Sequence, residues 1–191
     1  MRLFVALDIP EDVRQAISAF AAKLRPTCKH ARWARIEGAH VTLKFIGEAP
    51  AEKAEPIEAA LTNVPFLSAF ELVYRGAGFF PNERRPRVFW AGIEAGPELS
   101  VLAAAVEASL EPLGIAREPR EFSPHLTLAR FDSPDNLEGL RAAVAAAGPL
   151  EFGSGTANEF HLYQSALKRG GAEYTRLATF RSKSSLGSDP S

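Results

Sequence analysis

The stretch His40-Val41-Thr42-Leu43-Lys44-Phe45 (HVTLKF) occurs a second time, slightly altered, as HLTLARF at residues 125–131. Each copy has a histidine, an apolar residue, a threonine and a leucine in succession, and then a phenylalanine after one or two further residues. The two histidines stand 85 residues apart, at corresponding places in two halves that both alternate predicted strands and helices. The repeat therefore predicts an internal duplication.

Each copy is a short run rich in β-forming residues, and side chains alternate between the two faces of a strand. In the first copy this rule predicts His40, Thr42 and Lys44 on one face, and the apolar Val41, Leu43 and Phe45 on the other. Each strand should thus bury one face and present an imidazole beside a hydroxyl on its opposite face.

The second copy follows the same rule, with His125 and Thr127 on its polar face. Strict alternation places Arg130 on the opposite face, because it follows His125 by five residues, an odd number. If a pseudo-twofold relates the halves, two imidazoles and two hydroxyls converge on one small volume. Such a site suits a phosphoryl group, since one imidazole can act as a base and the other as an acid. A single copy alone would be an ordinary exposed strand face.

The rest of the chain alternates β-rich runs with helical patterns and closes on a polar, serine-rich segment. The predicted strands cover residues 2–9, 32–36, 40–46, 66–74, 87–93, 122–131, 160–167 and 174–180. The predicted helices cover residues 13–24, 51–61, 99–113 and 136–147. Runs 32–36 and 40–46 are predicted to form a hairpin around Glu37-Gly38. Residues 181–191 are predicted to be a disordered tail, which leaves residues 1–180 as one bilobal domain.

Composition excludes several classes of protein. With 46% apolar and 24% charged residues, the 191-residue chain is predicted to be globular. Its 22 basic and 23 acidic residues give a net charge of −1, so any contact with nucleic acid must be local. The single cysteine, Cys28, excludes intrachain disulfides and thiolate-rich metal sites. The apolar start is too short for a signal sequence and no run is long enough to span a membrane, so we expect a cytoplasmic protein.

The motif pair HVTL (40–43) and HLTL (125–128) resembles the twin signature of the two-histidine phosphoesterase superfamily. Further stretches resemble its RNA 2′,3′-cyclic phosphodiesterases, once called 2′–5′ RNA ligases: RLFVALDIP, HVTLKFIGE, GFFPNERRPRVFWAGI, EFSPHLTLARF and FHLYQSALKRGGAEY. The resemblance spans about residues 1–180. It departs at Gly171-Ala172, just before Tyr174, where the family often has Gly-Pro, and this affects only the shape of a loop.

The resemblance implies an α+β fold in which two antiparallel sheets face a central cleft and the helices lie outside. It also implies an enzyme that opens an RNA terminal 2′,3′-cyclic phosphate, or a small cyclic nucleotide, to a 2′-phosphate. The enzyme is expected to be a monomer that needs no metal or cofactor. Reversible 2′–5′ ligation is expected as an added reaction. By motif position His40 resembles the proton donor and His125 the proton acceptor. Thr42 and Thr127 resemble the phosphate-holding residues, and Arg130 matches a position near the substrate.

Two other readings of the same motifs stay open. A noncatalytic module that binds RNA ends or nucleotides would use the same residues but leave a cyclic phosphate intact. A metal-dependent hydrolase is disfavoured because the two motifs bring no Asp or Glu ligands of the kind that two-metal sites use.

Outside the motifs, four features have a structural and a functional interpretation. Cys28 and His30 are predicted to lie in an exposed loop rather than at a metal site, and His161 to be structural, with a place on the cleft rim as the alternative. A loop predicted at residues 76–86 carries arginines that either are simply solvated or follow an RNA backbone: Arg84, Arg85 and, just after it, Arg87. Three aromatic residues are predicted to pack in the core rather than stack on a base: Phe79, Phe80 and Trp90.

Overall fold

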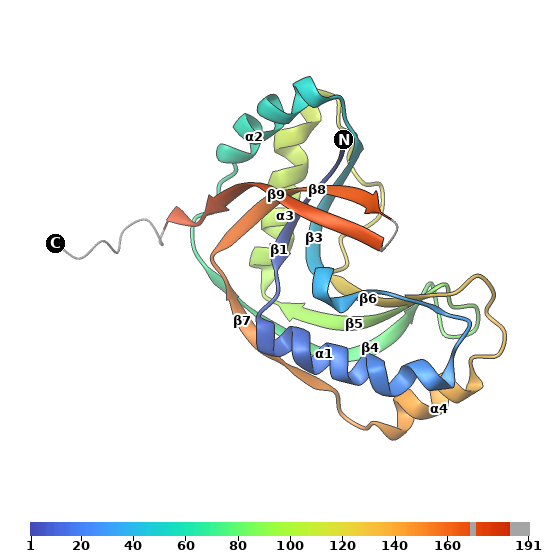
Figure 1. Cartoon of the computed structure of the whole chain (residues 1–191). Coiled ribbons are helices and arrows are strands. Elements are labelled where there is room, and N and C mark those ends of the chain that lie inside the picture. Colours follow the sequence, from blue (N-terminus) through green and yellow to red (C-terminus); the bar gives the residue numbers. More distant parts are fainter. Residues whose placement is uncertain (169–170, 184–191) are drawn as a thin grey trace.

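The computed structural model describes residues 1–168 and 171–183. This part of the chain contains nine strands and four α-helices (Figure 1). The strands are β1 (Arg2–Asp8), β2 (Arg32–Trp33), β3 (His40–Glu48), β4 (Phe70–Phe80), β5 (Val88–Ala95), β6 (His125–Arg130), β7 (Glu151–Ala157), β8 (Glu159–Lys168) and β9 (Gly171–Arg181). The helices are α1 (Glu11–Leu24), α2 (Ala54–Thr62), α3 (Pro97–Leu110) and α4 (Glu138–Ala146). No helix in this part is long and apolar enough to cross a membrane.

The strands form two sheets in which all neighbours are antiparallel. The four-stranded sheet has the order β3-β1-β8-β9, and the five-stranded sheet has the order β2-β6-β5-β4-β7. His40 begins β3 in one sheet and His125 begins β6 in the other. The predicted α+β fold with two antiparallel sheets and one motif in each is confirmed.

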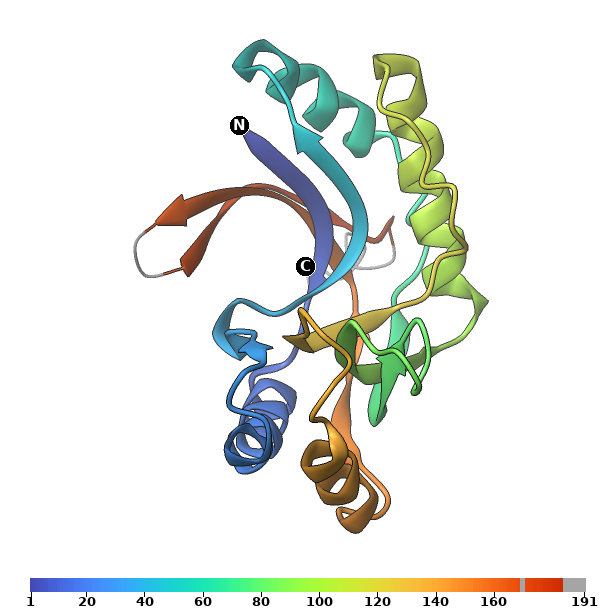
Figure 2. The same cartoon turned by 90° about the vertical axis from the view of Figure 1, so that its right-hand side faces the viewer.

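Each sheet is covered by a pair of helices, and each pair combines one helix from the first half of the chain with one from the second half. Helix α1 packs on β7 of the five-stranded sheet and against α4, whereas α3 packs on β3 of the four-stranded sheet and against α2 (Figures 1 and 2). The order β1-α1-β3-α2 thus recurs as β5-α3-β6-α4, and the first helix of each repeat lies on the sheet that holds the other motif.

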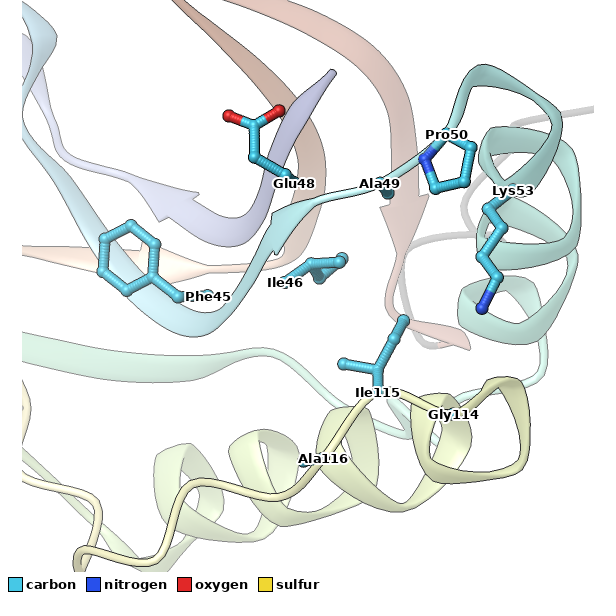
Figure 3. Close-up of a pocket in the computed structure, with 9 residues that line it drawn as sticks. All are labelled: Phe45, Ile46, Glu48, Ala49, Pro50, Lys53, Gly114, Ile115 and Ala116. Carbon is cyan, nitrogen blue, oxygen red and sulfur yellow. The ribbon is translucent and has the colours of Figure 1, made fainter.

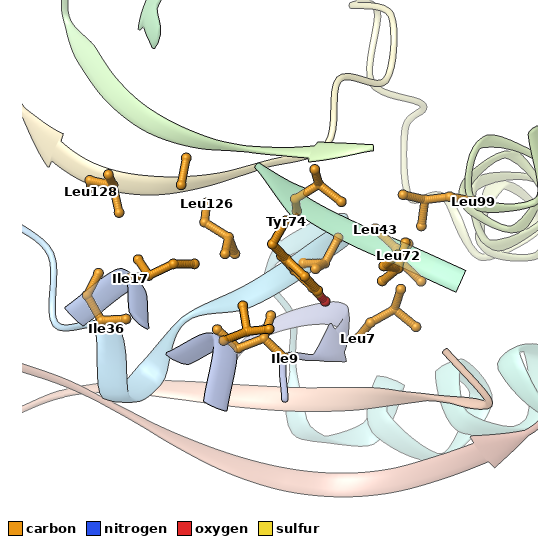
Figure 4. Close-up of a cluster of buried hydrophobic side chains, with 14 of the residues drawn as sticks. Leu7, Ile9, Ile17, Ile36, Leu43, Leu72, Tyr74, Leu99, Leu126 and Leu128 are labelled. Carbon is orange, nitrogen blue, oxygen red and sulfur yellow. The ribbon is translucent and has the colours of Figure 1, made fainter. Parts of the chain in front are cut away.

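One hydrophobic core serves both sheets. Leu43 of β3 and Leu126 and Leu128 of β6 lie in the same cluster, together with Ile17 of α1 and Leu99 of α3 (Figure 4). Burying a leucine or isoleucine contributes about 1.5–3 kcal/mol each. The apolar faces of the two motif strands are therefore anchored in a common interior, and the strands β3 and β6 contact one another.

The predicted hairpin between residues 32–36 and 40–46 is wrong. β2 is only two residues long and pairs with β6 of the other sheet, where Arg32 stands opposite Arg130. The amide of Ala34 continues this pairing by donating to the carbonyl of Leu128 at 2.8 Å. A turn of 3₁₀-helix, Ile36–Gly38, then turns the chain toward the other sheet.

Two other predictions for the middle of the chain need correction. Strand β4 runs on to Phe80, so residues 76–80 belong to a strand and not to the predicted loop. Strand β7 was not predicted, because its sequence, EFGSGTA, has two glycines and few β-formers. Gly155 is required there, since a Cβ atom would lie 2.4 Å from Pro10 at the start of α1.

At the ends of elements the structure refines the sequence prediction. Pro56 is compatible with α2 because it is the third helical residue, where an amide has no acceptor within the helix. The boundary predicted at residue 180 is wrong: Arg181 belongs to β9, Ser182 is fully buried, and the amide of Lys183 donates to the carbonyl of Phe66 at 3.0 Å. The remainder of the predicted tail, residues 184–191, lies outside the described residues.

Candidate active site

The two motif histidines have closely matched surroundings along their strands. Both are half-buried, and β3 and β6 show the same order of buried and accessible residues over their first six positions. The ring of His40 bonds to the backbone of Gly38, and Nδ1 of His125 lies 2.8 Å from the carbonyl of Ser123. Each ring is therefore held by the residue two positions before it, and donation from Nδ1 leaves Nε2 of His125 to face a ligand.

Each motif strand contains one extra residue directly after its threonine. Along β3, Thr42 pairs with Ala6 and Lys44 with Val5, so Leu43 is the additional residue. Along β6, Leu128 is additional in the same way, because Thr127 pairs with Trp90 and Ala129 with Phe89. Such a β-bulge reverses the alternation of faces beyond it.

The bulge in β3 overturns the predicted faces of Lys44 and Phe45. Lys44 does not share the face of His40: it is only 5% exposed, and its ammonium group contacts Glu107 Oε2 at 2.7 Å and the carbonyl of Ala116 at 2.6 Å. Phe45 does not lie on the core face: it is 65% exposed and pairs with Phe4.

The bulge in β6 likewise corrects the face of Arg130. Arg130 pairs with Val88, and Thr127 pairs with Trp90, two residues further along β5. Residues two apart on a strand share a face, so Arg130 lies on the same face as His125 and Thr127. Within residues 1–168 and 171–183, no protein group forms a hydrogen bond or ion pair with its exposed guanidinium group.

Aromatic rings surround both imidazoles. The ring centroid of His40 lies 4.5 Å from that of Tyr163 and 5.3 Å from that of Tyr174. The ring of His125 lies 5.0 Å from Phe80, which in turn lies 5.2 Å from Trp90. Phe80 is thus a half-buried neighbour of His125, the half-buried Trp90 packs on Phe80, and neither is the core residue that was predicted.

Of the three aromatic residues considered together, Phe79 follows the prediction. It packs on the core residue Phe89 at 5.0 Å.

Sequence reasoning missed the carboxylate of Asp8. Asp8 pairs directly with His40 across β1 and β3, and its Oδ1 atom lies 3.8 Å from Nε2 of His40. The hydroxyl group of Tyr163 donates to the same oxygen at 2.5 Å, and Arg176 forms an ion pair with the other. Burial lowers the pKa of His40, while the charge of Asp8 acts to raise it. The signal in the sequence was the acid that closes the first apolar run, six residues after Arg2.

His161 lies beside this cluster, on the strand β8 that pairs with β1. It is fully buried in β8, its Nδ1 atom lies 3.0 Å from the hydroxyl group of Thr179, and its Nε2 atom lies 3.6 Å from both Asp8 Oδ2 and Glu159 Oε1. Burial lowers the pKa of His161. The buried position supports the predicted structural role of His161.

The loop arginines lie beyond the end of β4. Arg84 and Arg85 are exposed, and their amides donate to Oδ1 of Asn82 at 3.0 Å, which fixes the turn. Arg87 donates to the carbonyl of Asp132. Contact between these arginines and an RNA backbone stays a prediction.

The Cys28 thiol is buried, contrary to the exposed loop predicted there, and burial raises its pKa. In the described ranges, no group of three or more His, Cys, Asp or Glu side chains is arranged to hold a metal ion.

A shallow pocket of about 260 Å³ lies at the far end of β3, between Phe45, Lys53 and Ile115 (Figure 3).

Comparison with known families matches both halves of the chain. The family model described as "LigT like Phosphoesterase" matches residues 7–90 and again residues 93–174. Each matched segment contains one motif histidine, which supports the internal duplication predicted from the repeat.

Similar proteins match most of the length of the chain. A protein of Methanothermobacter thermautotrophicus named RNA 2′,3′-cyclic phosphodiesterase is 32% identical and covers 95% of this chain and 98% of its own. A protein of Aeropyrum pernix with the same name is 36% identical and covers 86% and 96%. The crystal structure of Escherichia coli LigT complexed with 3′-AMP is 29% identical and superimposes with a TM-score of 0.79 over 95% of this chain and 98% of that one.

Proposed function

This chain belongs to the LigT-like phosphoesterase family, and from that premise we propose that it hydrolyses the terminal 2′,3′-cyclic phosphate of RNA to a 2′-phosphate by acid–base catalysis between His40 and His125. The observation that carries the proposal is the matched pair of half-buried imidazoles. Each histidine stands two positions before a threonine on the same strand face. The names of the similar proteins support the substrate class.

In this mechanism His125 removes a proton from water, which attacks phosphorus in line with the leaving oxygen. His40 donates a proton to O3′ as the P–O3′ bond breaks, so the phosphate stays on O2′. Thr42 and Thr127 donate hydrogen bonds to the nonbridging oxygens, where negative charge increases in the transition state. Arg130, brought to this face by its bulge, adds a charge-assisted contact to the phosphate.

The mechanism needs one neutral and one protonated imidazole at the same time. Imidazole is the side chain whose ordinary pKa is nearest to neutrality, so both states are accessible at the same pH. If the 5′-hydroxyl group of a second RNA end replaces water as the nucleophile, the P–O3′ bond breaks in the same way and the product is a 2′–5′ linkage, whose cleavage by O3′ would be the reverse of this ligation. We propose that the protein acts as a monomer on RNA ends and small cyclic nucleotides, in the cytoplasm and without a metal ion.

The test is to incubate the purified protein with an RNA that ends in a 2′,3′-cyclic phosphate, with and without chelator, and to resolve the 2′- and 3′-phosphate products by chromatography. We expect a 2′-phosphate in both reactions. An intact cyclic phosphate after saturating binding would favour the noncatalytic binding module. A 3′-phosphate would mean that the ribose lies in the opposite orientation, and loss of activity with chelator would indicate a metal-dependent enzyme.

A further inference from the structure

The two motif histidines differ in the residue that faces each of them across the sheet. His40 pairs with Asp8 of β1, whereas His125 pairs with Gly92 of β5. Residues directly opposite each other on antiparallel strands share a face, so each partner is a close neighbour of the imidazole. The duplicated motifs are thus alike in sequence and unlike in their nearest neighbour.

Gly92 has a steric reason to lack a side chain. A Cβ atom at this position would lie 2.4 Å from the carbonyl oxygen of Arg75 and 3.3 Å from the ring of Trp90. The pairing of β4 with β5 is irregular between Tyr74 and Ala77, and Arg75 lies within that interval. The backbone of β4 therefore excludes a carboxylate from the position beside His125.

Asp8, by contrast, is held firmly beside His40. Tyr163 donates to Oδ1 at 2.5 Å, Arg176 pairs with Oδ2, and His161 lies 3.6 Å from Oδ2. Arg176 also donates to the hydroxyl group of Tyr163 at 3.2 Å, which closes the network. These contacts keep Oδ1 at 3.8 Å from Nε2 of His40, close enough for a carboxylate to stabilise an imidazolium ion.

We propose that Asp8 is a positioning residue that assigns the proton-donor role to His40, because its carboxylate stabilises the protonated form of one imidazole while Gly92 leaves the other without such a partner. This inference rests on the proposed function.

The hydrogen bond to the backbone of Gly38 also raises the pKa of His40, but the other groups around the ring favour its neutral form. Burial lowers the pKa of His40, and so do the charges of Arg14 of α1 and His161 of β8. Arg176 of β9 carries a further positive charge on the far side of Asp8, and Tyr163 and Tyr174 contribute neutral rings. Asp8 is the acid that opposes these effects, so its removal should leave His40 less often protonated.

The test is the pH dependence of kcat/KM for Asp8→Asn, a substitution that keeps the size of the side chain and an oxygen for Tyr163. At pH 8 to 9 the deprotonated form of His40, which cannot donate a proton, is favoured. We therefore expect kcat/KM of Asp8→Asn to fall about 3- to 30-fold relative to the wild type in this pH range. At pH 5 the protonated form of His40 is more favoured in both proteins, and we expect the difference in kcat/KM between them to be smaller than at pH 8 to 9.

Glu159→Gln is the matched control, because Glu159 contacts His161 and Arg181 but not His40. It should leave the pH profile as it is in the wild type. An Asp8→Asn variant that loses activity by the same factor at every pH would overturn the proposal, since a purely structural defect acts in that way.

Titration of the imidazole proton signals by NMR gives a readout that does not need turnover. In Asp8→Asn the midpoint of His40 should move to lower pH, and that of His125 should stay in place. An unmoved His40 midpoint would overturn the role of Asp8 even in an active enzyme. A wild-type protein without phosphodiesterase activity would overturn the proposed function, while the NMR shift would still report on the contact between Asp8 and His40.

Discussion

Phe45 and Arg130 occupy equivalent positions in the two halves: each stands five residues after a motif histidine, and each is turned onto the histidine's face by one extra residue after the threonine. The bulges therefore extend both polar faces by one more side chain. One of these side chains is an exposed aromatic ring and the other is a cation. The duplicated scaffold thus offers two chemically different groups at matching distances along the two strands.

The position of Arg130 predicts that Arg130→Met weakens catalysis by the loss of a charge-assisted hydrogen bond to phosphate. Such bonds are worth about 1.5–3 kcal/mol, so kcat/KM should fall about 10- to 150-fold. Arg32→Met is the matched control, because Arg32 lies opposite Arg130 but pairs with Asp132 at 2.7 Å. Equal losses in the two variants would show that only general positive charge matters at this place.

The two histidines should each be indispensable for turnover. General acid or base catalysis contributes about 10²- to 10⁴-fold, and we expect His40→Ala and His125→Ala to lose activity within that range. Both variants should keep the circular dichroism spectrum of the wild type, because neither ring is fully buried. A variant that keeps full activity would remove that histidine from the mechanism.

The threonines should matter less than the histidines. Thr42→Val and Thr127→Val keep the branched shape that a strand favours and remove only the hydroxyl group. Loss of one donor to the developing charge should raise the barrier by up to about 3–4 kcal/mol, mainly through kcat. If steady-state kinetics of both variants match the wild type, the phosphate is held by other groups, such as Arg130.

Lys44 should be important for stability and not for chemistry. Its buried ammonium group pairs with Glu107, and the loss of one member of a buried pair leaves an uncompensated charge. We expect Lys44→Met to lower the free energy of unfolding by about 3 kcal/mol in chemical denaturation. The double variant Lys44→Met/Glu107→Leu should regain much of that loss; a double variant as unstable as the single one would contradict this account.

The buried His161 predicts acid sensitivity of the fold. Burial makes its pKa lower in the folded than in the unfolded chain, whose value is about 6.5. The unfolded state then binds more protons as pH falls below about 6.5, so the free energy of unfolding is fully retained above that pH and decreases below it. Urea denaturation at pH 7.5 and pH 5.0 should show a larger loss for the wild type than for His161→Gln. Equal losses would mean that His161 does not contribute.

The positions of the motif residues could be predicted from the sequence up to the threonine and not beyond it. Alternation correctly places His40 with Thr42 and His125 with Thr127, because both pairs precede the bulge. A bulge depends on how two strands pair, and the alternating pattern of one strand does not contain that information. Alternation placed Lys44 on the face of His40, and the partner that holds it elsewhere, Glu107, is 63 residues away on a helix.

The same limit explains why the neighbours of His40 were missed. Asp8 and Arg176 lie 168 residues apart in sequence and meet only because β8 joins β1 to β9 in one sheet. The hairpin prediction failed for a related reason, since nothing local to Arg32–Trp33 shows that its partner is β6. Local patterns predicted every strand except β7, whereas pairing between distant strands determined the surroundings of the site.

The exchange of helices between the two repeats has a consequence for how the molecule can come apart. Helix α1 lies on a sheet made mostly of later strands, α3 lies on the sheet of β1 and β3, and the last two strands complete the sheet that the first strand began. A cut between residues 91 and 92 would therefore pass through β5 and divide both sheets, and it would separate α1 from β7 and α3 from β3. Although the sequence contains a tandem repeat, we expect that neither repeat folds on its own and that the two unfold in one cooperative transition.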